Sequence, residues 1–267
     1  MTTRGRSAYS PGRFLARLRA IARPVTIFTI VYFAMLVYPP LRLAGLLWPD
    51  WQPGTGALLA VIVLPIAGRI AYELRPGTAS RGLAAVSLSW LGLAFLLFCV
   101  LLPAELLMLL LDPAPRTAGL LLAGLWFALG IGSLVNAQRI GVRRLSLPAP
   151  QLTRPLRLVQ ISDVHVGSRM GGFLARVSKR VAALEPDLVM ITGDLVDFRD
   201  IPVRDLASLS TLGAPTFFCI GNHERYVDCE AICARLESLG VKVLREAVDT
   251  SLPPLVIVGL DDAEPPS

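Results

Sequence analysis

The sequence predicts an N-terminal four-helix transmembrane region followed by a water-soluble α/β domain. Three observations predict this division: the composition, the distribution of charge, and a change in hydrophobic pattern near residue 150. Of the 267 residues 54% are hydrophobic and 17% are charged, whereas globular chains carry about 25% charged residues. Residues 1–152 hold 14 arginines and 4 acidic residues, while residues 153–267 hold 12 basic and 16 acidic residues. The positive charge therefore accompanies the apolar half, and we expect no nucleic-acid partner.

Four uncharged stretches account for the transmembrane prediction: residues 24–41, 51–68, 82–104 and 117–138. A helix needs about 20 mostly apolar residues to cross the hydrocarbon core of a bilayer. We therefore predict a basic cytoplasmic tail at 1–23, a transmembrane region of about four helices at 24–138, and a linker at 139–153. The apolar segment 106–111 is too short to span a membrane, so it is expected to lie at the interface.

The arginines predict the orientation of these helices. Of the 16 arginines up to Arg157, 14 lie in the tail, in the second connection and after the fourth stretch, whereas only Arg42 and Arg116 lie in the other connections. The positive-inside rule then predicts a multi-pass protein of the cell (inner or plasma) membrane whose second domain is cytoplasmic. The four stretches contain no ionisable residue, which favours anchoring in the phospholipid bilayer over transport. Aromatic residues at their ends are interpreted as interface anchors: Tyr38, Trp48, Trp51 and Tyr72.

Beyond the linker, the pattern alternates between short apolar runs and amphipathic helices. The runs predict strands at 156–161, 188–192, 216–220, 241–244 and 255–260, and the 3.6-residue periodicity predicts helices at 173–184, 203–212 and 229–239. Strands separated by helices of this length are typical of βαβ units and a mostly parallel sheet. We therefore predict an α/β domain over residues 154–267.

Polar residues follow the first three of these strands directly. Asp163 and His165 follow the first strand, Asp194 the second, and Asn222 and His223 the third. In open α/β sheets the ligand crevice lies beyond the carboxyl ends of the strands, so these side chains are expected to meet. Carboxylate, amide and imidazole groups without thiolates suit Mn, Fe, Zn or Mg. The sequence thus predicts a metal or phosphate site.

Each of these residues also has a purely structural interpretation. A single Gly-Asp after a strand is usually a turn or a helix cap, and a single histidine at a strand end is more often a hydrogen-bonded polar residue than a ligand. The chain has only two histidines, however, and both fall at strand ends beside an acid or an amide. The combination favours a site. Asp197 and Glu224 are expected to support it as neighbours or caps, and the four cysteines are expected to be free thiols.

The ordered motifs Asp163-x-His165, Gly193-Asp194 and Gly221-Asn222-His223-Glu224 resemble those of the calcineurin-like metallophosphoesterases, in particular bacterial membrane-anchored members. The resemblance implies an α/β/β/α sandwich with two divalent metal ions (Mn, Fe, Zn or Mg) at its edge. It implies that Asp163 and His165 bind the first metal, that Asp194 bridges both, and that Asn222 binds the second. It further implies that the catalytic residue His223 protonates the leaving oxygen or stabilises the transition state.

The resemblance covers only part of the family pattern. Family members supply further histidines downstream, one alone and a pair in a Gly-His-x-His element, and this sequence has no histidine after His223. We therefore expect residues 154–267 to be an incomplete metallophosphoesterase-like domain, the first half of the sandwich, that another chain could complete.

Two functions follow from these expectations. The first is a membrane-anchored, metal-dependent phosphoesterase that hydrolyses phosphomonoesters, phosphodiesters or pyrophosphates, including lipid-linked substrates. The second is a truncated, non-catalytic membrane protein whose degenerate phosphoesterase domain serves binding or assembly. No cofactor other than metal is expected.

Overall fold

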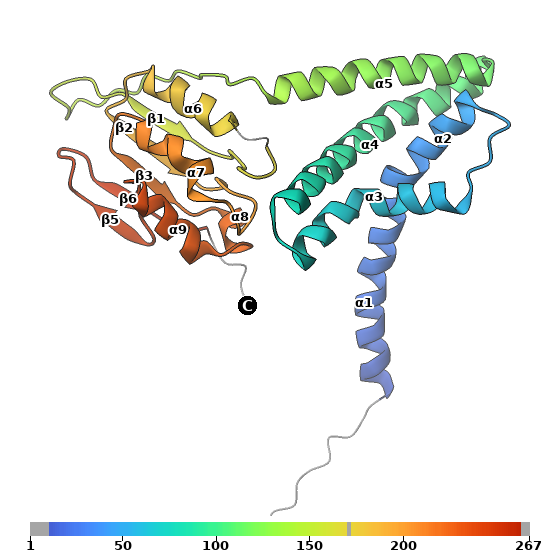
Figure 1. Cartoon of the computed structure of the whole chain (residues 1–267), viewed down its shortest axis with the longest axis horizontal. Coiled ribbons are helices and arrows are strands. Elements are labelled where there is room, and N and C mark those ends of the chain that lie inside the picture. The colour runs from blue at the N-terminus through green and yellow to red at the C-terminus, as the bar shows by residue number, and fades with distance from the viewer. Residues whose placement is uncertain (1–10, 170–171, 263–267) are drawn as a thin grey trace, which may run out of the picture. The chain divides into compact units, whose positions relative to one another are not determined.

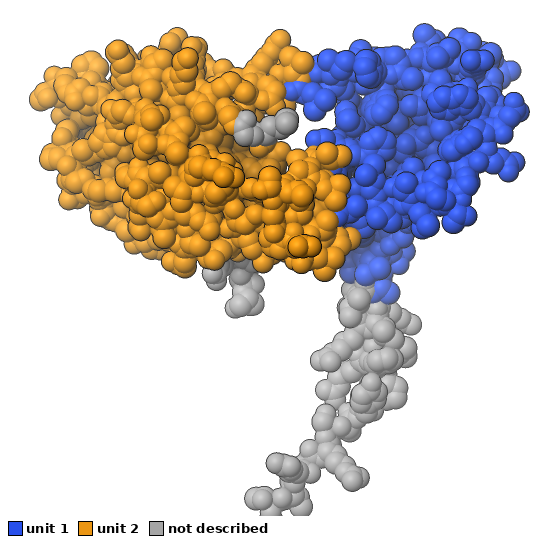
Figure 2. Space-filling view, in the orientation of Figure 1, with its two compact units in different colours: residues 1–67, 87–134 blue, residues 68–86, 135–267 orange. Residues whose placement is uncertain are grey.

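The computed structural model describes residues 11–169 and 172–262. Part of the predicted basic tail, residues 1–10, and the last residues of the predicted domain, 263–267, lie outside the described residues. The chain forms two compact units (Figure 2). One consists of Met1–Ala67 and Ser87–Leu134, and the other consists of Gly68–Val86 and Val135–Ser267.

The N-terminal part is helical. Its helices are α1 (Pro11–Tyr32), which continues through a π-helical turn at Phe33–Val37 into α2 (Tyr38–Leu47), then α3 (Thr55–Leu74), α4 (Thr78–Leu111) and α5 (Pro115–Ala137). Four segments are long and apolar enough to span a membrane: Ala22–Leu47, Thr55–Leu74, Thr78–Leu111 and Pro115–Ala137. The prediction of four membrane helices is confirmed.

Helix α4 corrects the prediction for residues 106–111. The sequence places Pro103 and Glu105 just before this segment, and we expected a separate interfacial piece. The helix instead continues through Pro103 to Leu111, so Glu105 lies inside a candidate span. Its carboxylate is paired, because Arg42 Nε lies 2.6 Å from Glu105 Oε1 and the Tyr38 hydroxyl donates to the same oxygen at 3.0 Å. An ionisable residue in such a helix is tolerated when it is paired in this way.

The C-terminal part is an α/β domain. Strands β1 (Leu158–Ile161), β2 (Leu188–Thr192), β3 (Thr216–Cys219) and β4 (Lys242–Val243) form one sheet in the order β1-β2-β3-β4, and every pair is parallel. The successive connections carry α6 (Phe173–Ala182), α7 (Val203–Leu206), a short α8 (Asn222–Arg225) and α9 (Cys229–Ser238), as Figure 1 shows. The predicted α/β class and parallel sheet are confirmed.

The two faces of the sheet are covered differently. Val189 and Ile191 of β2 pack with residues of α6, α7 and α9, whereas Leu188 and Met190 face the opposite way, as alternation along a strand requires. The second face packs against an antiparallel ribbon of β5 (Ala247–Asp249) and β6 (Ile257–Gly259). The predicted strand at 255–260 is therefore part of this ribbon, and its partner β5 has no counterpart among the predicted strands.

The ends of α3 and α4 belong to the same compact unit as the α/β domain. Tyr72 and Ala84 are each 1% exposed and lie in the domain's main hydrophobic cluster. The interpretation of Tyr72 as an interface anchor is therefore wrong. Its ring packs edge-on against Phe198 with 4.4 Å between the ring centroids, so protein and not lipid headgroups surrounds it.

Candidate metal centre

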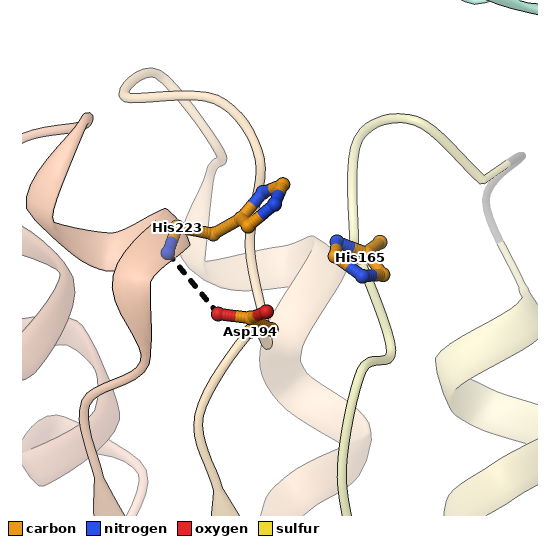
Figure 3. A group of neighbouring side chains, drawn as sticks. All are labelled: His165, Asp194 and His223. Carbon is orange, nitrogen blue, oxygen red and sulfur yellow. Dashed lines mark hydrogen bonds between the residues drawn. The ribbon is translucent and has the colours of Figure 1, made fainter. Parts of the chain in front are cut away.

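Three loops at the carboxyl edge of the sheet carry the predicted site residues. The loop after β1 holds Asp163 and His165, the loop after β2 holds Asp194, and α8 after β3 begins with Asn222 and His223. Because β1, β2 and β3 are adjacent and parallel, their carboxyl ends meet at one edge. Figure 3 shows the side chains of His165, Asp194 and His223 converging there.

The backbone at the predicted ligands is strained. Asp163, His165 and Asp194 have φ values of 56°, 55° and 53°. This left-handed conformation is uncommon for residues other than glycine and costs about 1–2 kcal/mol each. The strain is held by backbone bonds between the loops, since His165 N donates to Asp194 O at 3.0 Å and Val166 N to Leu195 O at 2.7 Å. Strained residues held in this way cluster at functional sites.

Two glycines allow the loops after β2 and β3 to touch. A Cβ on Gly193, whose φ is 77°, would lie 2.5 Å from Gly221 Cα, and a Cβ on Gly221 would lie 2.2 Å from Asp194 Oδ1. No larger residue fits without moving the backbone or the carboxylate. The close approach leaves the Asp194 carboxylate against the start of α8, where it accepts the His223 backbone N–H at 3.1 Å.

The donor atoms of three residues lie close enough to share a cation. One ligand atom each from His165, Asp194 and His223 lies within 4.8 Å of the other two. Asp163 lies outside this group of three but next to His165, because its Oδ1 lies 3.9 Å from His165 Nε2 and its side chain is 65% exposed. Asn222 is the first residue of α8 and is exposed beside His223. The structure thus brings His165, Asp194 and His223 together and places Asp163 beside His165, whereas Asn222 is exposed at the start of α8.

Asp197 contacts both histidines. Its Oδ1 lies 2.7 Å from Nδ1 of His165 and 2.7 Å from Nδ1 of His223, and its side chain is only 9% exposed. A carboxylate only accepts hydrogen bonds, so each Nδ1 carries the proton. The Nε2 lone pairs of both rings are consequently left for a metal or a substrate. The two rings pack edge to face with their centroids 4.6 Å apart.

Glu224 connects the loops after β2 and β3 through hydrogen bonds. It is fully buried, and its carboxylate accepts four backbone N–H groups. Oε1 accepts from Leu195 at 2.8 Å and Val196 at 3.1 Å, and Oε2 accepts from Asp194 at 2.9 Å and Gly221 at 2.8 Å. These bonds compensate the burial of its charge. They also fix the backbone of Asp194 relative to α8.

Electrostatics at this edge disfavour a thiolate ligand. Burial raises the pKa of the Cys219 thiol at the end of β3, and the nearby carboxylates of Asp261 and Glu224 raise it further. The thiol therefore stays protonated at neutral pH and does not compete as a thiolate ligand. The remaining donors are carboxylates and imidazoles, which match the preferences of Mn, Fe, Zn or Mg. The residues present fit a divalent metal ion.

A parallel sheet whose carboxyl edge gathers aspartate and histidine side chains is an arrangement that can hold a divalent metal ion. Residues 156–261 match the family described as calcineurin-like phosphoesterase. Residues 156–261 are therefore similar to the calcineurin-like phosphoesterases, and they follow helices that are long and apolar enough to span a membrane.

Several known proteins are similar to part of this chain. The chain is 32% identical to a transmembrane protein with metallophosphoesterase domain from Danio rerio over 51% of the chain and 35% of that protein. It is 42% identical to the UDP-2,3-diacylglucosamine pyrophosphatase LpxG of Chlamydia trachomatis over 26% of the chain and 22% of that protein. It is 33% identical to an uncharacterized metallophosphoesterase of Aquifex aeolicus over 51% of the chain and 54% of that protein.

The matches thus span about a fifth to a half of these relatives. No solved structure matches the chain significantly.

Two features of the site were not apparent from the sequence. The double contact of Asp197 had a faint signal, since an acid three residues after Asp194 was expected to support the site. The contacts of Tyr72 with Phe198 and the residues after it had no signal in the sequence, because 128 positions separate Tyr72 from Asp200.

Proposed function

We propose that this protein is a membrane-anchored, metal-dependent phosphoesterase that hydrolyses phosphomonoester, phosphodiester or pyrophosphate bonds at a dinuclear site. The observation that carries the proposal is the convergence of His165, Asp194 and His223 within 4.8 Å at the carboxyl edge of the sheet. It occurs within a calcineurin-like phosphoesterase domain, so the geometry and the family support the same chemistry.

The metal ligands in this proposal are Asp163, His165, Asp194 and Asn222. Nε2 of His165 faces Asp163 Oδ1, so these two would hold one ion. Asp194 would bridge to a second ion held by Asn222, because a small carboxylate can neutralise part of the charge of two cations. When bound, such ions polarise the phosphoryl oxygens and stabilise the charge that develops on them.

His223 is proposed as the acid that serves the leaving oxygen. Asp197 Oδ1 lies 2.7 Å from Nδ1 of His223, and this hydrogen bond orients the ring. The side chain is 40% exposed, so Nε2 can reach a bound phosphoester. A histidine held in this way can donate a proton to the departing oxygen when its Nε2 is protonated.

The substrate class is proposed to be a membrane-associated, lipid-linked phosphoester. The four candidate spans would hold the domain at a bilayer, and one relative is named for a diacylated nucleotide-sugar pyrophosphate. The arginine distribution supports a cytoplasmic placement of the domain, at the cell (inner or plasma) membrane.

The test uses the full chain, purified without a histidine tag and reconstituted in lipid nanodiscs. Hydrolysis of bis(p-nitrophenyl) phosphate and of a UDP-linked diacyl glucosamine is measured with added Mn²⁺. Asp194→Asn should reduce kcat/KM by at least 100-fold, since outer ligand partners alone are worth 10–100-fold. The matched control is Asp112→Asn, the same change at an exposed loop position.

Asp112→Asn should retain wild-type activity. If wild type hydrolyses neither substrate faster than Asp194→Asn, the proposed catalysis is wrong. Hydrolysis of the aryl diester without hydrolysis of the lipid-linked substrate would reject only this lipid-linked substrate.

A further inference from the structure

The polypeptide between α3 and α4 is built into the α/β domain. Residues 68–86 form one compact unit with residues 135–267, and Figure 2 colours them together. Ser80 closes the turn internally, because its hydroxyl donates to Arg75 O at 2.7 Å and Gly77 O at 3.0 Å. Tyr72 and Ala84 enter the core of the domain. This hairpin therefore has a defined structure and a defined docking site.

Both the ring and the hydroxyl of Tyr72 contact the α/β domain. Its ring lies edge-on against Phe198. Its hydroxyl donates to Asp200 Oδ1 at 2.8 Å and accepts the backbone N–H of Arg199 at 3.0 Å. A buried hydroxyl that both donates and accepts fixes its neighbours strongly, because losing either bond leaves a partner unsatisfied.

Charged side chains of the hairpin also pair with residues of the loop 198–205. Arg81 is 12% exposed and lies 3.7 Å from Asp200 Oδ2 and 3.8 Å from Asp205 Oδ2. Glu73 is paired with the guanidinium of Arg199. The hairpin thus contacts residues 198–205 through an aromatic ring, a hydroxyl and two ion-pair partners.

This loop begins at the residue that orients both histidines. Asp197, whose carboxylate lies 2.7 Å from Nδ1 of each imidazole, directly precedes Phe198. The Phe198 ring also packs on Gly167, where an added Cβ would lie 2.4 Å from Phe198 Cδ2. Gly167 stands two residues after His165. Phe198 therefore contacts both Tyr72 and the His165 loop, and a shift of its backbone would move Asp197.

We propose that Tyr72 is a positioning residue for the metal centre. By fixing residues 198–200, the end of an apolar helix fixes the Asp197 carboxylate and, through it, the tautomer and orientation of His165 and His223. The inference rests on the proposed function for its effect on catalysis. Its effect on the two imidazoles does not depend on that function.

The test compares Tyr72→Phe with Ser80→Ala in the full chain in nanodiscs. Both variants remove one hydroxyl from the same hairpin, but the Ser80 hydroxyl bonds only within it. The first readout is the ¹⁵N spectrum of histidine at fixed neutral pH without metal, which is simple to assign because the chain has two histidines. The others are Mn²⁺ affinity by electron paramagnetic resonance, and kcat and KM for the aryl diester.

Wild type and Ser80→Ala should show both rings protonated at Nδ1, whereas Tyr72→Phe should show mixed tautomers. Tyr72→Phe should also bind Mn²⁺ about tenfold more weakly, at the low end for groups that orient a ligand, and lose kcat without a matching change in KM. Asp200→Ala removes the acceptor of the same hydroxyl and should reproduce these effects. Should Tyr72→Phe fail to fold, Asp200→Ala alone decides.

Histidine spectra and Mn²⁺ affinity that match wild type in both variants would overturn the inference. An inactive wild type with altered histidine spectra in the variants would reject the proposed function and keep the inference.

Discussion

The buried carboxylate of Glu224 offers the sharpest test of how the strand ends are held together. Glu224→Gln preserves the shape of the side chain but replaces one oxygen, which accepts two backbone N–H groups, by an NH₂ group that cannot accept them. Each hydrogen bond to a charged group is worth about 1.5–3 kcal/mol, so two lost bonds should cost about 3–6 kcal/mol. That is a large share of the 5–15 kcal/mol that stabilises a typical domain.

The assay is hydrogen–deuterium exchange of the full chain in nanodiscs, followed by mass spectrometry of peptides that cover β2 and β3. A cost of about 3–6 kcal/mol corresponds to roughly 10²–10⁴-fold faster exchange for amides that exchange by opening of the domain. Glu237→Gln is the matched control, because Glu237 lies exposed at the end of α9, and its exchange should match wild type. Wild-type protection in Glu224→Gln would refute the role given to this carboxylate.

Three further predictions concern other parts of the same domain. Gly221→Ala should weaken Mn²⁺ binding at least tenfold in a titration, because its Cβ would displace the Asp194 carboxylate, while Gly141→Ala, which has open space around it, should not. Hydrogen bonds from Lys242 and Ser251 lower the pKa of Asp249 to about 2, whereas the pKa of an unfolded aspartate is about 3.9. The stability that the Asp249 carboxylate adds is therefore present above about pH 4 and is lost as the pH falls toward 2. The pepsin cleavage rate of Asp249→Asn relative to wild type should therefore exceed one at pH 4 and approach one near pH 2; a pH-independent ratio would contradict this assignment. Burial raises the pKa of the Cys233 thiol to about 12. A variant whose only cysteine is Cys233 should therefore react with N-ethylmaleimide at pH 8 much more slowly than a variant whose only cysteine is Cys229. Equal reaction rates would show that α9 does not bury the Cys233 thiol.

Much of the fold could be predicted from local pattern. The apolar stretches were long enough to predict the membrane helices, and the alternation of strands and helices predicted the parallel sheet with nearly correct bounds for β2 and α9. The failures have physical causes. Helix α4 continues through Pro103 and Glu105, and the glutamate is paired there with Arg42 and Tyr38, which lie over 60 positions away in the sequence.

The site also has a part that could be predicted from the sequence and a part that could not. Positions that follow strands could be predicted, because parallel strands deliver their carboxyl ends to one edge whatever the side chains are. The supporting contacts could not, since they depend on tertiary packing. Tyr72 ends an apolar helix, which by pattern is typical of an interface anchor, and only its burial against Phe198 distinguishes the two roles.

The most direct test of the central claim is the electron spin-echo modulation spectrum of Mn²⁺ bound to the full chain, prepared without a histidine tag. The wild-type protein should show coupling to an imidazole nitrogen, and His165→Gln should lose it, because the two imidazoles are the only ones in the chain and His223 is assigned to the substrate. A wild-type spectrum without nitrogen coupling, or coupling that survives in His165→Gln, would contradict a metal centre built in this way at the edge of the sheet.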